Sequence, residues 1–503
     1  SSGETREDTF AVNVLASAPV AESKGTVPFS LRSPAIATRK LGQSPARKSG
    51  QSPKTALFDP KGETARLLTQ LGVRFDAVAA DADLGGYGLL VVGKAALSVD
   101  GAAPDISRVR DGLKVVMFEQ TADVLEKRFG FRVQEYGLRQ VFPRVPDHPL
   151  LSGLETDNLH DWSGQATILP PRLTNYTMKP SFGPTNQWCG IQVPRAYRAG
   201  NWGNVASVLI EKPACGNFLP IVDGGYSLQF SPLMEYREGK GVVLLCQMDV
   251  TGRTEDDPAA ARLVANMLNY VSTYVPPAPR KACYVGLEAG RKHLEQMGLT
   301  VATYQGGSPA TDEVLVVGPG GGPALAAHAD ALRRWIASGG NVLAIGLGQE
   351  EANAFLPFSV KSQKREYICA LFPPPSLTSL LAGIGPADVM NRDPREIELL
   401  SEGVTPLGDG VLAVAPHANV VFCQLVPWEF DYQKYFNLKR TFRRASCLVS
   451  RALGNMGVDG PTPMLERFSS PAGKGAAGDR RWLTGFYLDK PEEFDDPYRY
   501  FGW

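Results

Sequence analysis

Three side chains of this 503-residue chain are candidate nucleophiles, because each stands where a predicted strand ends. They are Cys246, Cys423 and Thr121. A thiol or hydroxyl attacks a carbonyl only when a neighbouring base takes its proton, and histidine is the usual base. The chain has five histidines, at positions 148, 160, 293, 328 and 417. His293 and His328 fall inside predicted helices rather than at strand ends, so we expect no catalytic residues in this chain.

A cluster of tryptophans suggests a second chemistry, the binding of carbohydrate. Sugars stack their C–H faces on aromatic rings, while their hydroxyls bond to amide and carboxylate groups. The predicted glycan-binding residues are Trp162, Trp188, Trp202, Asp161, Asp249 and Arg253, the last two following a predicted strand at a sheet end. Two alternatives stay open. The tryptophans would hold a loop or a subunit interface together, and the acidic stretch 249–257 would cap the next helix.

Nothing in the spacing of the polar residues predicts a metal or a cofactor. The seven cysteines form no CxxC pair or other ligand pattern, so we expect no metal site. The loop Gly318–Pro323 precedes a helix, but it lacks the Lys-Ser/Thr of a P-loop and the spacing of a dinucleotide fingerprint. We therefore expect no bound cofactor.

The elements that would position these residues occur twice along the chain. Leu89–Gly93 is matched by Val314–Gly318, and Leu150–Leu154 is matched by Leu380–Ile384. Repeating units of solenoid proteins are much shorter than the interval between these matches. The repeat therefore predicts two copies of a whole domain.

The first copy carries an insertion that the second lacks. Phe142 and its counterpart Phe372 are 230 positions apart, whereas Cys246 and Cys423 are 177 apart, which leaves 230 − 177 = 53 additional residues. This insertion, about 160–215, holds the three tryptophans and the apolar segment Val205–Ile210. Binding residues are often carried on loops above a rigid sheet, so we expect any binding function there.

Strands alternate with helices in both copies, including helices at 63–71, 121–129 and 324–338, which predicts parallel sheets covered on both faces. We expect an α/β protein with two tandem, doubly wound, flavodoxin-like domains. The expected segments are a terminal β-sandwich strand (1–18), a linker (19–53), the first domain (54–276), the second domain (277–457) and a docking C-terminal tail (458–503).

The overall charge excludes some classes of partner. Lys+Arg and Asp+Glu both number 52, so the net charge is zero, and no apolar run is as long as a membrane span. We therefore expect neither a nucleic-acid partner nor a membrane partner. The chain begins inside a strand pattern, so we expect the natural protein to extend upstream. The compartment stays open, and the sequence admits a periplasmic or secreted location.

The order of elements around Leu89–Gly93, His148–Leu154 and Asn341–Gly346 resembles class I glutamine amidotransferase-like domains. The resemblance implies a cysteine at the turn after the central strand, where the N-terminus of the next helix lowers the thiol pKa. Here Gln120 and Leu347 stand at the corresponding elbows. We therefore expect both elbows to be degenerate.

Several stretches resemble the C-terminal region of glycoside hydrolase family 2 (β-galactosidase-like) proteins: Phe58–Thr64, His160–Gln165, Ala206–Pro213, Cys246–Glu255 and Gly485–Arg499. That family carries its catalytic glutamates on a TIM barrel, for which this chain has no room beside two repeats. Related β-galactosidases use an amidotransferase-like domain for subunit assembly. The resemblance thus implies an accessory region whose partners are further copies of itself, or upstream catalytic and β-sandwich domains.

We therefore expect a non-catalytic accessory region of a β-galactosidase-like glycoside hydrolase that serves assembly and contacts glycans. One alternative is a self-standing carbohydrate-binding protein. The other is an active hydrolase or amidase that uses a cysteine or Thr121 as its nucleophile.

Overall fold

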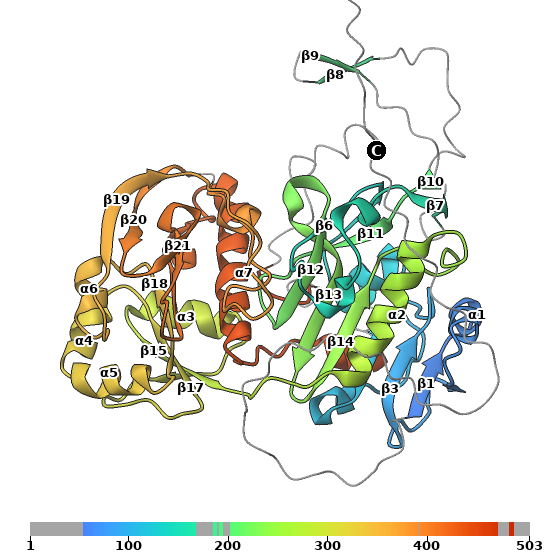
Figure 1. Ribbon diagram of the computed structural model, residues 1–503, viewed down its shortest axis with the longest axis horizontal. Helices are drawn as coiled ribbons and strands as arrows, with labels where there is room; N and C mark the ends of the chain where they lie inside the picture. The colour runs from blue at the N-terminus through green and yellow to red at the C-terminus, as the bar shows by residue number, and fades with distance from the viewer. Residues whose placement is uncertain are drawn as a thin grey trace, which may run out of the picture.

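The computed structural model describes residues 54–166, 185–188, 191–194, 202–391, 393–470 and 482–486. Within them the protein is a mixed α/β structure with two large sheets that contain parallel strands. Figure 1 shows two halves side by side, blue to green for the first and yellow to red for the second. The predicted strand 1–18 and linker 19–53 lie outside the described residues.

Five neighbouring strands of the first sheet are parallel, in the spatial order β2–β1–β3–β4–β14. The central strands are nearly continuous apolar runs, as expected of a sheet covered on both faces, and all six residues of β14 are buried. The carboxyl ends of the five strands therefore meet at one edge. Their bounds are β1 Lys54–Phe58, β2 Asp76–Ala77, β3 Tyr87–Val92, β4 Lys114–Met117 and β14 Gly241–Cys246.

The second sheet repeats this arrangement, with five parallel strands in the order β16–β15–β17–β18–β23. In both sheets the second strand along the chain lies at the edge and the first lies next to it. All five residues of β18 and all four of β23 are buried. The bounds are β15 Lys281–Val285, β16 Val301–Thr303, β17 Glu313–Val317, β18 Asn341–Ile345 and β23 Val420–Cys423.

Antiparallel strands extend each sheet. The prediction that Val205–Ile210 belongs to an insertion above the sheet is wrong, because β11 lies within the sheet between β13 and β5. All six of its residues are buried, and successive side chains point to opposite faces. The added strands of the first half are β5 Val133–Leu138, β6 Phe142–Pro143, β11 Ala206–Glu211, β12 Phe218–Gly224 and β13 Phe230–Glu238. Those of the second half are β21 Thr405–Leu407 and β22 Leu412–Val414.

Three short two-stranded sheets complete the strand content. Two come from the predicted insertion: β7 Trp162–Gln165 with β10 Trp202–Gly203, and β8 Thr185–Trp188 with β9 Ile191–Pro194. The third joins β19 Lys361–Tyr367 to β20 Arg395–Glu402 in the second half.

The helices mostly match the sequence pattern, but one is interrupted. The helix predicted at 324–338 is two helices, α4 and α5, because the backbone at His328 leaves the helical conformation (φ −120°, ψ 16°). The helix predicted at 121–129 contains a π-helical segment, Val124–Phe129. No described helix combines the length and apolarity needed to cross a membrane. The α-helices are α1 Glu63–Gln70, α2 Pro258–Thr273, α3 Glu288–Gln296, α4 Gly322–Ala326, α5 Ala329–Ala337, α6 Gln349–Asn353, α7 Lys439–Asn455 and α8 Met464–Ser469.

The same side-chain hydrogen bonds recur in the two halves. Asn266 on α2 donates from Nδ2 to the carbonyls of Leu150 and Ser152, at 3.0 and 2.9 Å. Asn455 on α7 donates to the carbonyls of residues 380 and 382 at the same two distances. The last long helix of each half is therefore attached to a corresponding turn in the same way.

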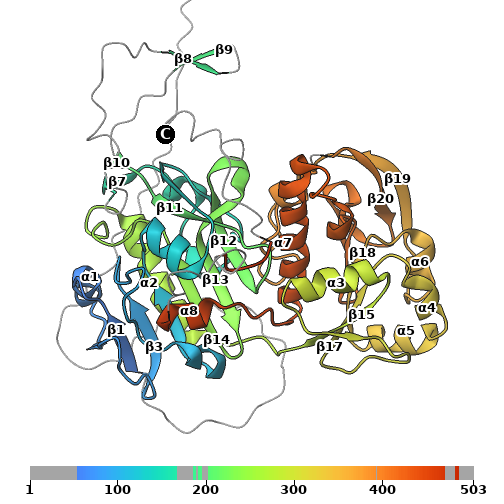
Figure 2. The ribbon, with the colours of Figure 1, turned by 180° about the vertical axis from the view of Figure 1, so that it is seen from behind.

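The C-terminal segment contacts both halves. Met464 and Phe468 on α8 are buried in the core of the first half, over which α8 lies in Figure 2. Phe486 instead joins the core of the second half, with its ring centroid 4.9 Å from that of Phe442 on α7. Residues 487–503 of the predicted docking tail lie outside the described residues.

Candidate functional site

Gln120 occupies the elbow at the carboxyl edge of the first sheet, and it is completely buried. Its backbone N–H donates to Oε1 of Gln247 at 2.9 Å, and Nε2 of Gln247 donates back to its carbonyl at 2.9 Å. Its own Nε2 donates to the carbonyls of Gly93 and Phe118. The elbow is thus tied to the ends of β3, β4 and β14, and the Gln120 side chain is enclosed, whereas the next residue, Thr121, is exposed.

The elbow of the second sheet is closed in a similar way. Leu347 is fully buried, and its carbonyl accepts a hydrogen bond from Nε2 of Gln424 at 3.0 Å. Gln424 follows β23 just as Gln247 follows β14. In each half, the glutamine after the last parallel strand therefore bonds to the elbow beside it.

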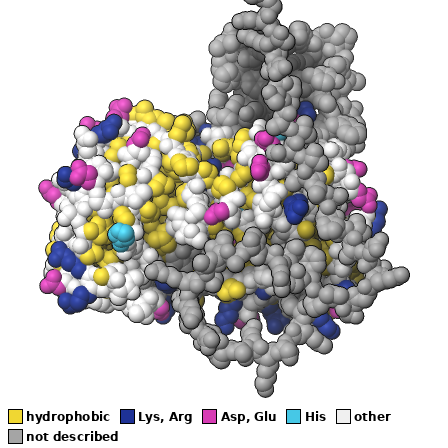
Figure 3. All heavy atoms as spheres, viewed as in Figure 1, with side chains coloured by type: hydrophobic (Ala, Val, Ile, Leu, Met, Phe, Trp, Pro, Cys, Tyr) yellow, Lys and Arg dark blue, Asp and Glu magenta, His cyan; other side chains and the backbone are white. Residues whose placement is uncertain are grey.

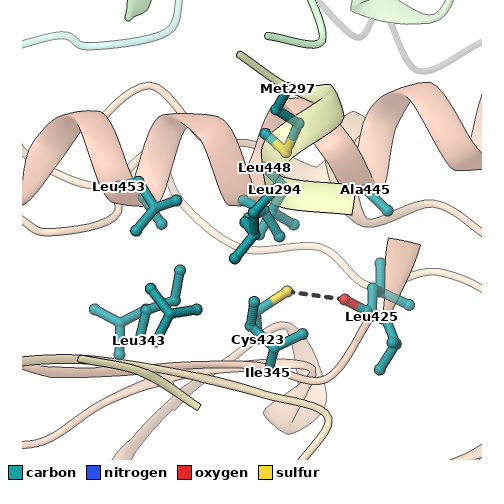
Figure 4. Close-up of a cluster of buried hydrophobic side chains, with 14 of the residues drawn as sticks. Leu294, Met297, Leu343, Ile345, Cys423, Leu425, Ala445, Leu448 and Leu453 are labelled. Atoms are coloured by element: carbon teal, nitrogen blue, oxygen red, sulfur yellow. Dashed lines mark hydrogen bonds between the residues drawn. The ribbon is translucent and has the colours of Figure 1, made fainter. Parts of the chain in front are cut away.

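Burial makes the two strand-end thiols unreactive. Cys423 lies beneath α7 among Leu343, Ile345 and Leu448, and its thiol points to the carbonyl of Leu425 at 3.3 Å (Figure 4). Burial raises the pKa of Cys423 to about 12. Burial, with Glu119 nearby, raises the pKa of Cys246 well above its ordinary value. Because the thiolate is the nucleophilic form, neither thiol is suited to attack at neutral pH.

The third candidate nucleophile and the histidines have other partners. Thr121 Oγ1 accepts a hydrogen bond from the Val124 N–H at the start of a helical segment. His148 bonds through Nε2 to Glu235 at 2.9 Å, with both side chains buried. Burial lowers the pKa of His293 to about 4. Within the described part of the chain, no hydrogen bond joins a histidine to Thr121, Cys246 or Cys423.

A buried carboxyl group lies beside the first elbow. Glu119 accepts hydrogen bonds from the Thr251 N–H at 2.7 Å and from Thr251 Oγ1 at 2.8 Å. Burial, together with the charge of Asp249, raises the pKa of Glu119 to about 7. A carboxylic acid with a pKa perturbed in this way is a candidate functional group, and both of its carboxyl oxygens bond to Thr251.

The structure assigns three of the predicted glycan-binding residues to the core, so those predictions are wrong. Trp162 is 2% exposed, and its indole N–H donates to the Asn158 carbonyl. Arg253 is buried and donates to Asp249 Oδ2 at 3.1 Å and to the Trp162 carbonyl at 2.6 Å. A ring or guanidinium enclosed in this way presents no face to a sugar. The helix-start alternative fits better, with Asp257 accepting from the Ala259 N–H as the cap of α2.

Of the other predicted glycan-binding residues, the structure describes the side chain of Asp161. Asp161 is exposed and pairs with Arg139 at 2.6 Å. Trp188 lies in β8 and Trp202 in β10, and β10 pairs with β7. The side chains of both tryptophans lie outside the described residues, so the glycan prediction at these two positions stays a prediction.

A buried ionic cluster joins the two halves, and the sequence patterns did not predict it. Lys212 Nζ lies 3.3 Å from Asp223 Oδ2 in the first half and 3.1 Å from Asp388 Oδ1 in the second. Arg144 also pairs with Asp223. Burial alone would lower the pKa of Lys212, but Asp223 and Asp388 outweigh it and raise that pKa. One sequence feature does indicate such a cluster: Asp223 lies in an otherwise apolar strand, β12. A charged side chain that is buried in this way is usually paired with an opposite charge.

Among the described residues, no group of three or more histidine, cysteine, aspartate or glutamate side chains could hold a metal ion. The cysteines that the structure describes are all free, and only Cys369 is exposed.

Comparison with known proteins gives little further information. No protein-family model matches the chain, and a search of curated proteins finds no match. Among solved structures, the chain is similar to the structure of PurLQS from Thermotoga maritima. That alignment has 10% identity and covers 36% of this chain and 100% of that one, with a TM-score of 0.24. So low a score establishes no relationship, and the resemblance to glycoside hydrolase family 2 stays a prediction.

Proposed function

We propose that this chain is a non-catalytic assembly region built from two tandem, flavodoxin-like domains of the amidotransferase-like type. The observation that carries the proposal is the closure of both elbows, where Gln120 and Leu347 are buried and hydrogen-bonded to Gln247 and Gln424. A catalytic elbow must instead expose a nucleophile to its substrate. The shared strand order 2-1-3-4-5 supports the flavodoxin-like assignment.

An assembly role is supported by exposed apolar side chains on the second half. Leu371 is 91% exposed and Ile368 is 44% exposed, three residues apart in the segment after β19. In Figure 3, hydrophobic side chains gather over the face of the second half, and charged side chains lie mostly at its rim. Contiguous exposed apolar surface is typical of protein interfaces. The partner we propose is a second copy of this chain.

Sedimentation velocity of the wild-type chain and of Leu371→Ser tests the assembly role. We expect the wild type to self-associate, and we expect Leu371→Ser to shift the equilibrium toward a species of 54.3 kDa. Val275→Ser is a matched control, since Val275 is 80% exposed but lies in the connection between α2 and β15. Wild type that remains at 54.3 kDa at every concentration would refute the assembly role.

We also propose that the parent protein is a β-galactosidase-like glycoside hydrolase, on the strength of the sequence stretches alone. The test is the coding sequence upstream of Ser1. A TIM barrel with paired glutamates there would support the proposal, and an upstream sequence without one would contradict it.

A further inference from the structure

The second half carries a groove at the amino edge of its sheet. The groove lies between the end of α5 and the hairpin that joins β22 to β23, and it encloses about 350 Å³. That volume falls within the roughly 300–1,000 Å³ that is typical of ligand pockets. Most of the lining is apolar, with a few polar side chains: it includes Ile336, Leu380 and Val414, and also Ser379, His417 and Asn419.

Neither the groove nor an exposed segment near it carries an acidic or a strongly basic side chain. No described residue that lines the groove is Lys, Arg, Asp or Glu, although these residues make up 21% of the chain. Residues 367–387 likewise contain none of them, and this stretch includes the exposed Ile368 and Leu371. Removing a charge from water is costly, so an uncharged surface is best covered by another uncharged surface. The groove and the exposed segment are therefore compatible partners.

Leu371 and the groove lie at opposite ends of one short strand. Ala370 and Phe372, the neighbours of Leu371, pack against Gly408, which precedes β22. Val414, the last residue of β22, lines the groove. The three residues of β22 span about 10 Å. Leu371 is thus close to the groove of its own chain but lies outside it, with 91% of the residue exposed.

The corresponding hairpin of the first half, between β13 and β14, is covered by the chain itself. Arg110 pairs both with Glu238 at the end of β13 and with Glu466 on α8. The Thr462 N–H also donates to the hydroxyl of Tyr236 on β13, at 2.9 Å. In the second half, the β22–β23 hairpin instead borders the groove. A second copy of the chain can therefore cover this hairpin as residues 462–466 cover its counterpart.

We propose that Leu371 of one copy inserts into the groove of a second copy. This inference rests on the proposed self-association, and it names the surface that receives Leu371. In a two-fold dimer each contact occurs twice, so the Leu371 side chain of either copy occupies the groove of the other. The short separation along β22 suits this exchange, because the two-fold axis can pass between the two sites and both contacts form together.

Sedimentation velocity of Ala337→Asp tests the receiving surface. Ala337 lines the groove and is exposed, so the substitution places a charge in the groove without disturbing the core. We expect the dissociation constant of the dimer to rise at least about tenfold, as it should for Leu371→Ser. The matched control is Ala327→Asp, at an exposed alanine that ends α4 outside the groove, and it should leave the constant unchanged.

The two substitutions should not act independently, because they remove the same contact. The variant that combines Ala337→Asp with Leu371→Ser should raise the dissociation constant by less than the product of the two separate changes. Urea unfolding checks that each variant is folded.

Cysteine cross-linking identifies the contact directly. All chains carry Cys369→Ser, which removes the exposed native thiol. Leu371→Cys is mixed with His417→Cys under mild oxidation, since His417 is exposed and lines the groove. We expect peptide mapping to find a disulfide between position 371 of one chain and position 417 of another. No such link should form when Val275→Cys replaces His417→Cys, because Val275 lies in the connection between α2 and β15.

The results separate this inference from the assembly role on which it rests. A wild type that self-associates, with no 371–417 disulfide and with equal dissociation constants for Ala337→Asp and Ala327→Asp, would overturn the groove contact and leave the assembly role standing. A wild type that stays at 54.3 kDa at every concentration would overturn both. Association that continues beyond a dimer would contradict the two-fold exchange.

Discussion

Lys212 in the first half and Asp388 in the second lie 3.1 Å apart, from Nζ to Oδ1, and both side chains are buried. Asp388 is further fixed by the Gly385 N–H, which donates to its Oδ2 at 2.8 Å. Burial would raise the pKa of Asp388, but Lys212 and Arg144 outweigh it and lower that pKa. The halves are therefore held together by a charged contact in the interior, in addition to apolar packing.

Replacing Asp388 by asparagine should destabilise the protein strongly. Removing one partner of a buried ion pair typically costs about 3–5 kcal/mol, and we expect the lower end because Asp223 still accompanies Lys212. Urea unfolding measures the change. The exposed pair Lys361–Glu402 is the control, where Glu402→Gln should cost less than about 1 kcal/mol. Equal losses at the two sites would contradict the assigned role of the buried contact.

Asn266 and Asn455, which occupy corresponding positions in the two halves, should contribute similar free energies to stability. Asn266→Ala and Asn455→Ala each remove two hydrogen bonds to backbone carbonyls, which should cost about 1–3 kcal/mol at either site. Denaturant titration of both variants and of the double variant gives the values. A loss at only one of the two positions would argue against equivalent structural roles in the two halves.

Glu119 should make stability depend on pH in an unusual direction. Its pKa is about 7 in the folded protein against an ordinary 4.5, so the folded state holds the proton more tightly. The free energy of unfolding should therefore fall as pH rises from about 4.5 to about 7, by roughly 3 kcal/mol. Glu119→Gln keeps a hydrogen-bonding side chain beside Thr251, but this side chain does not ionise. The variant should therefore show no such fall, and at pH 8 it should be more stable than the wild type.

The matched control for Glu119→Gln is Glu350→Gln, at an exposed position. Its difference in unfolding free energy from the wild type should stay small at every pH. If the difference between wild type and Glu119→Gln does not change between pH 4.5 and pH 8, the buried-acid assignment is wrong.

The thiols should differ widely in reactivity. A disulfide reagent at pH 8 should modify the exposed Cys369 of the native protein quickly. Cys246 and Cys423 should react only after unfolding, because both are fully buried and their pKa values are raised. Peptide mapping by mass spectrometry distinguishes the sites. Rapid modification of either buried thiol would revive the hydrolase alternative.

Much of the architecture follows from local sequence pattern. Continuous apolar runs such as Leu89–Val92 and Val342–Ile345 form buried parallel strands, and the glycine after each run marks the strand end. The sequence does not reveal the break at His328, because good helix formers lie on both sides of it. Likewise, β11 was assigned to an insertion, since apolar content alone does not reveal which strand it pairs with.

The site was harder to predict than the fold. Trp162 and Arg253 have the residue types of a sugar site, yet their burial depends on contacts among segments distant in the sequence. The contact between Lys212 and Asp388 spans 176 residues.

Native-state hydrogen exchange at the elbows tests the central claim most directly. The Gln120 N–H is buried and bonded to Gln247, so we predict that it exchanges only through global unfolding, with the same free energy as the core strand β14. Ligand-binding and active-site segments are typically among the less stable parts of a protein, so we expect a catalytic elbow to open more readily than the core. If Gln120 exchanges through local opening several kcal/mol below the global value, the elbow is accessible and the non-catalytic account is contradicted.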